Sequence, residues 1–472
     1  MKNIEQIYTN CLAQGSYFIE SAGEAAVIDP LRETDPYIDR AIESGVKIKY
    51  IFETHFHADF VSGHLDLAKK TGATIVYGPT ATTDFPKHEA FDGEVFSIGD
   101  IKIKAIHTPG HTPESTSYLL IDEKGKEKAI FTGDTLFIGD VGRPDLAQKA
   151  TGLTQEDLAG WLFDSLRNKI MPLPDSVIVY PAHGAGSACG KNMSSETWDT
   201  LGNQKKTNYA LRPDMSKSEF IDEVTAGLME PPQYFALNAA LNKKGYASID
   251  KIMKAGLTPL SVEEFKVKMK DPEVMVLDVR DKNEFSEGFI PGSLFIGLDG
   301  TFAPWVGALI EDINQKIILV TPEDREEEAV RRLARVGYDH SIGYLAGGIK
   351  AWKNAGEKLE SIEVMSMEDF GKKVLKKDLS IVDVRKPGEY ESTHVDGAIS
   401  IPLDYFPKGN FKELDKENKS YVHCRSGFRS TVASSMLYQN GYRNIVNVIG
   451  DVDILKETDV PLKGNCPSLL VS

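Results

Sequence analysis

The sequence predicts an α/β protein of several domains, and three observations support this prediction. The chain has 472 residues, more than one hydrophobic core normally organises. In residues 1–240, segments rich in β-forming residues repeatedly end in histidine and aspartate motifs. In the rest of the chain, short apolar strands alternate with helices in a pattern that occurs twice, with a period of about 105 residues. Such a period is too long for a solenoid repeat and indicates two whole domains, each with a parallel sheet.

The composition is that of an ordinary globular protein, with 41% hydrophobic and 26% charged residues. A net charge of −16 argues against nucleic acid or an anionic membrane as the main partner. The N-terminus lacks the long apolar region of a signal peptide, and no apolar run reaches membrane-spanning length. The cysteines are widely spaced and unlike a disulfide framework: Cys11, Cys189, Cys424 and Cys466. We therefore expect a cytoplasmic protein in which a functional cysteine is a working thiol.

The first strand-end motif is the run Thr54–Phe60. Residues 47–52 alternate like a half-buried strand, and residues 61–70 have helical spacing. His55, His57 and Asp59 therefore lie in a strand-to-helix turn, where all three side chains can point into one cavity. Surface histidines are the alternative, but three of the ten histidines fall between positions 55 and 64.

Three more strand ends carry similar groups. A strand ending near residue 106 leads to His111, a hairpin around residues 123–125 leads to Asp134, and a buried strand at 177–180 leads to His183. The segment 194–244 is predicted to be helical, with Ser216 as an N-cap. Each motif contains small residues or proline beside the polar group, as expected where a chain turns sharply at a site.

The order of these motifs, THFHADF, TPGHT, GDT and PAHG, resembles the metallo-β-lactamase superfamily. The resemblance implies an αββα sandwich over residues 1–257, with a metal at one edge between the sheets. One departure is informative: the first motif of the family usually ends in Asp-His, and here Asp59 is followed by Phe60. A phenyl ring cannot bind a metal, so we expect one ion rather than two.

The resemblance implies that this ion is held by His55, His111 and Asp134. Two histidines and one carboxylate are the ligand set of non-haem Fe(II) oxygenases, whereas structural zinc usually has four closed ligands. Within the superfamily the pattern resembles the persulfide dioxygenases, which implies one Fe(II) per chain. His57, Asp59 and His183 would then orient ligands and polarise water around the iron.

Two loops beside this site are further candidates. Arg143, in the sequence GRPD, is expected either to hold the site loops and neutralise a persulfide anion or to form only a salt bridge with Asp145. After His183, a run of small residues reaches Cys189 and Lys191. Cys189 is expected either to accept a sulfane sulfur or to be a small buried residue. Lys191 and Arg143 are expected to contact substrate.

The repeat in the second half is carried by Val276–Arg280 and 381–385, both ending in Asp-Val-Arg. It resembles the rhodanese family of sulfurtransferases and implies two rhodanese-like domains, 258–360 and 361–472. In the second copy, Cys424 follows a strand and precedes a helix expected to begin at Thr431. Backbone N–H groups and the positive helix end favour a thiolate and would hold the terminal charge of a persulfide. The residues expected around Cys424 are Arg425, Ser426, Gly427, Phe428 and Arg429.

The first copy has Val320 and Thr321 where the second has Cys424, with acidic residues following. It therefore cannot form a persulfide. We interpret it as a structural or docking domain, with a degraded substrate subsite as the alternative. The residues around Cys466 indicate no function, and a role as a resolving thiol is a hypothesis only.

Together the resemblances imply that iron and O2 oxidise the terminal sulfur of a low-molecular-weight thiol persulfide to sulfite. Cys424 would carry a second sulfane sulfur and transfer it to sulfite, giving thiosulfate. Two alternatives stay open: a zinc thioester hydrolase of the glyoxalase II type fused to a sulfurtransferase, and a non-enzymatic sulfur carrier or persulfide sensor. The expected partners are the thiol persulfide, O2 and sulfite, and the expected assembly is a homodimer or homotetramer.

Overall fold

The computed structural model describes residues 4–148, 152–228, 230–376 and 379–464. Cys466 lies outside these ranges. The chain divides into two compact units, one made of residues 1–251 with 334–337 and the other of 252–333 with 338–472. Within the described residues, none of the helices combines the length and the apolar composition needed to cross a membrane.

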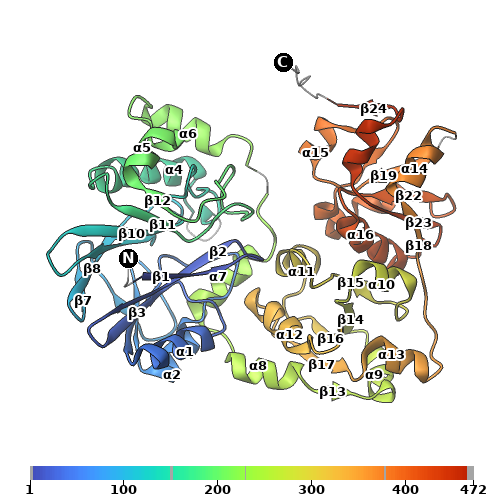
Figure 1. Ribbon diagram of the computed structural model, residues 1–472, viewed down its shortest axis with the longest axis horizontal. Helices are drawn as coiled ribbons and strands as arrows, with labels where there is room; N and C mark the ends of the chain where they lie inside the picture. The colour runs from blue at the N-terminus through green and yellow to red at the C-terminus, as the bar shows by residue number, and fades with distance from the viewer. Residues whose placement is uncertain (1–3, 149–151, 229, 377–378, 465–472) are drawn as a thin grey trace. The chain divides into compact units, whose positions relative to one another are not determined.

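The first unit contains two six-stranded sheets, coloured blue to green in Figure 1. The strands of the first sheet follow in chain order: β1 (Ile4–Thr9), β2 (Gln14–Ser21), β3 (Glu24–Ile28), β4 (Lys47–Phe52), β5 (Thr74–Tyr77) and β6 (His88–Glu89). Those of the second sheet are β7 (Val95–Ile98), β8 (Ile101–His107), β9 (Thr116–Ile121), β10 (Glu127–Gly133), β11 (Ile178–Pro181) and β12 (Asp199–Thr200). Residues 4–28 form three strands, and Gly15 lies inside β2.

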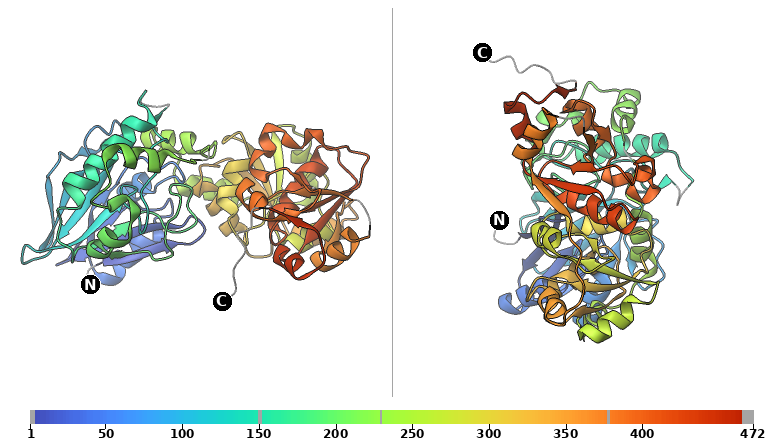
Figure 2. Two further views of the ribbon diagram at one scale, coloured as in Figure 1. Left: turned by 90° about the horizontal axis from the view of Figure 1, so that it is seen from above. Right: turned by 90° about the vertical axis from the view of Figure 1, so that its right-hand side faces the viewer.

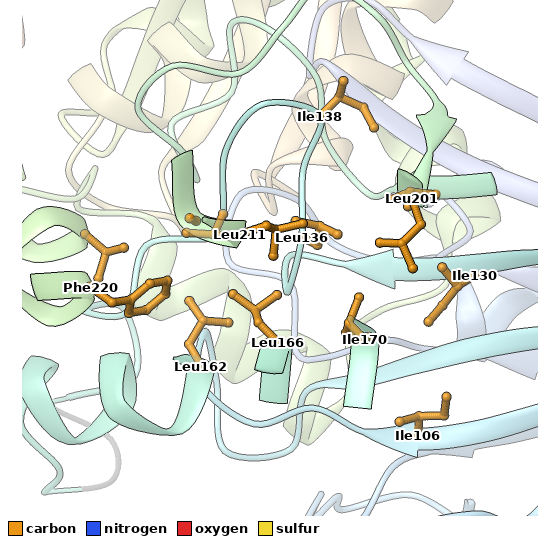
Figure 3. Close-up of a cluster of buried hydrophobic side chains, with 14 of the residues drawn as sticks. Ile106, Ile130, Leu136, Ile138, Leu162, Leu166, Ile170, Leu201, Leu211 and Phe220 are labelled. Atoms are coloured by element: carbon orange, nitrogen blue, oxygen red, sulfur yellow. The ribbon is translucent and has the colours of Figure 1, made fainter. Parts of the chain in front are cut away.

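Helices cover the outer faces of both sheets. Figure 2 gives two further views of the ribbon diagram, with this unit again in blue to green. The helices are α1 (Asp35–Ser44), α2 (His64–Thr71), α4 (Gln155–Ser165), α5 (Leu201–Thr207), α6 (Lys217–Thr225) and α7 (Phe235–Lys244), followed by α8 (Ile249–Gly256). Side chains of α1 and α2 pack on the first sheet, whereas α4 and α6 pack on the second, in the apolar cluster of Figure 3. A third apolar cluster lies between the sheets. The αββα sandwich predicted from the resemblance is therefore confirmed.

The second unit contains two parallel five-stranded sheets with helices around them. The first copy consists of β13 (Pro259–Leu260), α9 (Val262–Met269), β14 (Val274–Asp278), α10 (Lys282–Glu287), β15 (Leu294–Phe295), α11 (Phe302–Leu309), β16 (Lys316–Val320), α12 (Glu326–Arg335), β17 (Ser341–Leu345) and α13 (Gly348–Asn354). The second consists of β18 (Glu363–Ser366), α14 (Met367–Val374), β19 (Ser380–Asp383), α15 (Pro387–Ser392), β21 (Ile399–Ser400), β22 (Ser420–His423), α16 (Phe428–Gln439) and β23 (Ile445–Ile449), with β20 (His394–Val395) paired to β24 (Leu462–Lys463).

The two copies share their sheet order and a buried ion pair. The strand orders β13-β17-β16-β14-β15 and β18-β23-β22-β19-β21 place equivalent strands at equivalent positions. Arg280 Nη2 lies 2.7 Å from Asp278 Oδ2, and Arg385 Nη2 lies 2.6 Å from Asp383 Oδ2. The repeated Asp-Val-Arg motif therefore performs the same structural task in both domains, and the predicted parallel α/β fold of this half is confirmed.

Candidate metal centre and cysteine loop

Three strand ends of the first unit bring His55, His111 and Asp134 together. All three are buried, and their potential ligand atoms lie within 4.8 Å of one another. The Nε2 atoms of His55 and His111 lie 3.8 and 3.5 Å from the same oxygen, Asp134 Oδ2. That oxygen has no hydrogen-bond partner, which is unusual for a buried carboxylate. Two imidazole nitrogens and one unpaired carboxylate oxygen facing one gap fit a divalent metal ion.

The hydrogen bonds of both rings leave the Nε2 lone pairs directed at this gap. His111 Nδ1 lies 2.8 Å from the carbonyl oxygen of Arg143, which can only accept a hydrogen bond. His55 Nδ1 lies 3.0 Å from the hydroxyl of Thr54. These partners place the proton on Nδ1 of each ring. Nε2 of each ring is then free to bind a metal. Burial lowers the pKa of His55, which keeps its ring neutral as ligation requires.

His183 contacts two carboxylates. Its Nδ1 is hydrogen-bonded to Asp134 Oδ1 at 2.8 Å, and its Nε2 lies 2.8 Å from Asp59 Oδ2. Although burial alone would lower it, the neighbouring carboxylates of Asp134 and Asp59 raise the pKa of His183 well above its usual value. The contact with Asp59 is at an ion-pair distance, and among the described residues Nε2 of His183 has no hydrogen-bond partner. Phe60, fully buried, lies 6.5 Å from this ring between centroids.

His57 lies in a buried group beside the three metal-capable residues. Its Nε2 is 3.1 Å from Asp29 Oδ1 and 3.6 Å from Glu53 Oε2, and its ring centroid is 4.2 Å from that of His55. Burial and the charge of Asp29 raise the pKa of Glu53, whose carboxylate also accepts a hydrogen bond from Ser62. Neither Asp29 nor Glu53 was expected from the sequence. The sequence signal that could have identified them is their position directly after β3 and β4, which are neighbouring parallel strands.

The Cys189 loop lies beside the same centre. Cys189 is 1% exposed, and its sulfur lies with atoms of Asp59 and His183 in a second group of potential ligands. Burial raises the pKa of the Cys189 thiol well above its usual value. The amide of Arg143 donates to the Cys189 carbonyl at 2.9 Å, so the Arg143 backbone links the Cys189 loop to His111.

The side chains of Arg143 and Lys191 have other partners within the protein. The guanidinium of Arg143 donates to both oxygens of Asp145, at 2.6 and 2.7 Å, which is the salt bridge considered as its alternative role. The ammonium of Lys191 donates to the carbonyls of Glu223 and Ala226 near the end of α6. Asp140, which the sequence did not single out, accepts the amide of Lys191 at 2.6 Å and so holds the Cys189 loop.

In the second unit, Cys424 lies at the turn between β22 and α16. The amide of Gly427 donates to Cys424 Sγ at 3.1 Å, and the Ser430 hydroxyl lies 3.7 Å from the same sulfur. Gly427 has a φ of 101°, and a side chain there would approach within 2.8 Å of Ile449. This conformation lets α16 begin at Phe428, three residues earlier than the predicted Thr431.

The two arginines of the loop differ in environment. Arg429 forms a two-pronged ion pair with Glu389, at 2.6 and 2.8 Å, and this pair holds the pKa of Glu389 below its usual range despite burial. Arg425 is 67% exposed. It lines a cavity of about 270 Å³ together with Arg385, Glu389, Ser392, Thr393, His394, Val395, Val452, Asp453, Lys456 and Leu462.

The first copy retains the shape of this turn without the thiol. Thr321 follows β16 by one residue, as Cys424 follows β22, so Thr321 rather than Val320 takes the cysteine position. Three residues later Asp324 has a φ of 62°, matching the positive φ of Gly427. The Thr321 hydroxyl donates to Glu326 at 3.2 Å. An acidic side chain thus occupies the turn that would have to hold an anionic persulfide.

Comparison with known proteins agrees with this geometry. The Metallo-beta-lactamase superfamily profile matches residues 10–183, and the Rhodanese-like domain profile matches 261–355 and 366–456. A crystal structure of a metallo-beta-lactamase from Staphylococcus aureus subsp. aureus COL is 33% identical, with a TM-score of 0.62, and the match covers 72% of this chain and 97% of that one. The chain belongs to the metallo-beta-lactamase superfamily. Two rhodanese-like domains follow its metallo-β-lactamase domain.

Curated relatives of the metallo-β-lactamase domain carry a hydrolase name. The hydroxyacylglutathione hydrolase GloC of Haemophilus influenzae is 27% identical, over 44% of this chain and 98% of its own length. The cytoplasmic hydroxyacylglutathione hydrolase of Arabidopsis thaliana is 34% identical, over 36% of this chain and 62% of its own length. The superfamily and the buried donor set together support a metal cofactor in the metallo-β-lactamase domain, and the two rhodanese-like domains indicate a link to sulfur metabolism.

Proposed function

We propose that the protein is a persulfide dioxygenase coupled to a thiosulfate-forming sulfurtransferase. The metallo-β-lactamase domain, residues 1–257, would oxidise a low-molecular-weight thiol persulfide to sulfite at one Fe(II). The second rhodanese-like domain, 361–472, would transfer sulfur through Cys424, and the first, 258–360, would serve a structural role. A cytoplasmic location and a dimeric or tetrameric assembly belong to the same proposal.

The residue at position 60 is the observation that carries this proposal. The second metal of a hydrolytic pair would need a further histidine beside Asp59 and His183, and Phe60 stands where the related motif has that histidine. His55, His111 and Asp134 remain as a two-histidine, one-carboxylate set with open positions. This donor set is typical of non-haem Fe(II) oxygenases.

The iron would supply binding and activation of O2 next to the substrate sulfur. The overall reaction is balanced as RSSH + O2 + H2O giving RSH, sulfite and two protons. The sulfane sulfur loses four electrons and O2 gains them. The residues of this chain hold the ligands: Thr54 and the Arg143 carbonyl fix the imidazoles, and His183 fixes the carboxylate of Asp134. Burial of the centre limits the access of water to the persulfide.

Cys424 would act in two transfer steps. Its thiolate attacks the terminal sulfur of a second persulfide, the S–S bond of that persulfide breaks, and the thiol RSH leaves. Sulfite then attacks the terminal sulfur of the Cys424 persulfide, which releases thiosulfate and restores the thiolate. The Gly427 amide, 3.1 Å from Sγ, supports the anionic sulfur, and the basic side chains of Arg385, Arg425 and Lys456 line the adjacent cavity.

A zinc-dependent thioester hydrolase is the second candidate, favoured by the names of the relatives. Hydroxyacylglutathione hydrolases match 36–44% of this chain. In that case the metal would activate water against a thioester, and Cys424 would be an independent sulfurtransferase. A non-enzymatic sulfur carrier would require neither reaction.

One experiment separates these functions. Protein purified anaerobically is analysed for metal and then given a glutathione or coenzyme A persulfide while O2 and sulfur products are followed. We expect about one iron per chain, O2 uptake that depends on persulfide, and thiosulfate as product. Cys424→Ser should keep O2 uptake but release sulfite, and His111→Ala should abolish O2 uptake. Stoichiometric zinc with hydrolysis of S-acylglutathione and no O2 uptake would overturn the proposal.

A further inference from the structure

We propose that Asn242 is a positioning residue of the metal centre. Its side chain lies on α7 and holds three backbone groups in and beside the turn between β4 and α2, the turn that carries His55 and Asp59. The superfamily profile ends at residue 183, so α7 lies outside the residues that it matches. The inference rests on the proposed function only in taking the two histidines and the aspartate of the metal centre as ligands. It does not depend on which reaction the metal supports.

The turn needs hydrogen-bond partners from elsewhere in the fold. Residues 53–61 lie between β4 and α2 and have an irregular backbone. A regular helix or sheet ladder therefore does not satisfy their N–H and C=O groups. His57, Phe60 and Ser62 are fully buried, where an unpaired backbone group is costly. A side chain that supplies the missing bonds therefore helps to determine where the turn lies.

Asn242 supplies bonds to three of these backbone groups. Its Nδ2 donates to the carbonyl oxygens of His57 and Phe60, both at 2.8 Å. Its Oδ1 accepts from the amide of Ser62 at 2.9 Å. The two carbonyls can only accept and the backbone amide can only donate, so these partners determine the orientation of the side-chain amide. Both N–H donors of Asn242 and its acceptor are thus used on one turn.

The residue at position 246 adds a second hold on the same turn. The hydroxyl of Tyr246 donates to the Ser62 carbonyl and accepts from the amide of Leu65, in the first turn of α2, at 3.3 Å. Both backbone groups of Ser62 are therefore bonded to side chains from residues 242–246. Because Asn242 is fully buried, water has no ready access to replace its bonds if the side chain is removed.

The held turn reaches one metal-binding residue through Asp59. The two carbonyls that Asn242 binds lie on either side of Asp59 in the sequence. Asp59 Oδ2 lies 2.8 Å from His183 Nε2, and His183 Nδ1 is hydrogen-bonded to Asp134 Oδ1 at 2.8 Å. A displaced turn would therefore move the carboxylate of Asp59 and, through His183, disturb the carboxylate of Asp134.

The same turn carries another metal-binding residue directly. His55 precedes His57 by two residues, and the centroids of their rings lie 4.2 Å apart. The bond from Asn242 to the His57 carbonyl holds the backbone next to His55. Partners outside the ligand set that orient metal ligands commonly change metal affinity when they are removed. We therefore expect the metal geometry to depend on Asn242 at both ends of the turn.

α7 also offers a matched control one turn earlier. Asn238 lies four residues before Asn242 on the same helix and is equally buried. Among the described residues, neither polar atom of the Asn238 side chain has a hydrogen-bond partner. Asn238→Leu therefore removes a buried amide without breaking a bond, whereas Asn242→Leu leaves two carbonyls and one backbone amide unpaired. The comparison separates the effect of these bonds from the effect of a changed buried side chain.

The test measures metal binding in the full-length protein. Affinity for Fe(II) and Co(II) is measured by chelator competition without O2, and the Co(II) absorption spectrum reports the ligand geometry. We expect Asn242→Leu to bind both metals about tenfold more weakly, with a changed Co(II) spectrum. Asn242→Asp keeps the shape and the acceptor for the Ser62 amide but loses the donors, and should change affinity in the same direction. Asn238→Leu should leave affinity and spectrum unchanged.

Hydrogen exchange of the metal-free protein gives a second readout. Peptides covering residues 57–63 should exchange faster in both Asn242 variants than in Asn238→Leu, because the turn loses bonds that hold it closed. If Asn242→Leu does not fold, Asn242→Asp carries both measurements. Affinity and spectrum equal to those of the unsubstituted protein in the folded Asn242 variants would overturn the inference. Absence of O2 uptake in the unsubstituted protein would reject the proposed reaction alone, because metal affinity is measured apart from it.

Discussion

The phenyl ring of Phe60 lies against the imidazole of His57, with ring centroids 4.4 Å apart and both side chains fully buried. Phe60 occupies the position at which the related first motif has a histidine. Its ring also lies 6.5 Å from that of His183. A phenyl ring at this position offers no ligand atom to a second metal ion.

Phe60→His should allow a second metal ion to bind. The new imidazole would lie beside Asp59 and His183. A metal ion bound there could displace the proton between His183 and Asp59. We expect metal content to rise from about one towards two ions per chain after reconstitution with excess zinc, measured by atomic emission. Phe137→His is the matched control, since Phe137 is buried and its ring lies 6.2 Å from that of His183. Equal metal content in both variants would contradict the role given to position 60.

His183→Gln should destabilise the metal-free protein strongly. The imidazolium of His183 is shared by Asp59 and Asp134, and its loss leaves two buried carboxylates without a cation. We expect a loss of about 3–5 kcal/mol in the free energy of unfolding, measured with urea in the presence of a chelator.

His107→Gln serves as the control for the His183 variant. His107 Nε2 lies 2.8 Å from the carbonyl of Pro113, a neutral partner, so the expected loss is about 1 kcal/mol. Similar losses in the two variants would mean that His183 is not held as a shared cation.

The metal centre was predictable from sequence to the extent that its groups lie at strand ends. His55, His111 and Asp134 each follow a strand with a clear pattern, so their convergence could be expected from the order of the motifs. Asp29 was missed because Asp-Pro after a strand also reads as an ordinary turn. Its partner Thr54 is 25 residues away in sequence, and only the pairing of β3 with β4 brings the two together.

The cysteine turn was predicted in kind but not in detail. Cys424 was identified from the flanking strand and arginines, yet the start of α16 was placed three residues too late. The conformation of Gly427, with a φ of 101°, lets the helix begin directly after the loop. The ion pair between Arg429 and Glu389 joins residues 40 positions apart and depends on the packing of α15. Local sequence carries no signal for such a contact.

His64→Phe should remove a pH dependence of stability. His64 is buried among the rings of Tyr77, Phe85 and Tyr246, with centroids 5.0–5.9 Å away, and burial lowers its pKa to about 3. Because the unfolded chain takes up a proton near pH 6.5 and the folded protein does not, stability is retained above pH 6.5 and falls as the pH drops towards 3.

The comparison requires urea unfolding of both proteins between pH 7.5 and 5. Phenylalanine keeps the aromatic packing and cannot titrate. The unsubstituted protein should lose about 2 kcal/mol relative to His64→Phe between pH 7.5 and 5. A difference between the two proteins that does not change with pH would show that His64 takes up a proton as readily in the folded protein as in the unfolded chain.

Phe295→Ala, a change in the copy without a cysteine, should slow sulfur transfer at Cys424. Phe295 is fully buried, its ring centroid lies 6.1 Å from that of Phe428, and its amide donates to Ser435 in α16 at 3.1 Å. The first copy thus supports the helix whose N-terminus forms the cysteine turn. Phe265→Ala, equally buried beside Trp352, is the control, and the rate of thiocyanate formation from thiosulfate and cyanide is the measurement. We expect a several-fold slower rate for Phe295→Ala alone. Equal rates in the two variants would leave the first copy without this supporting role.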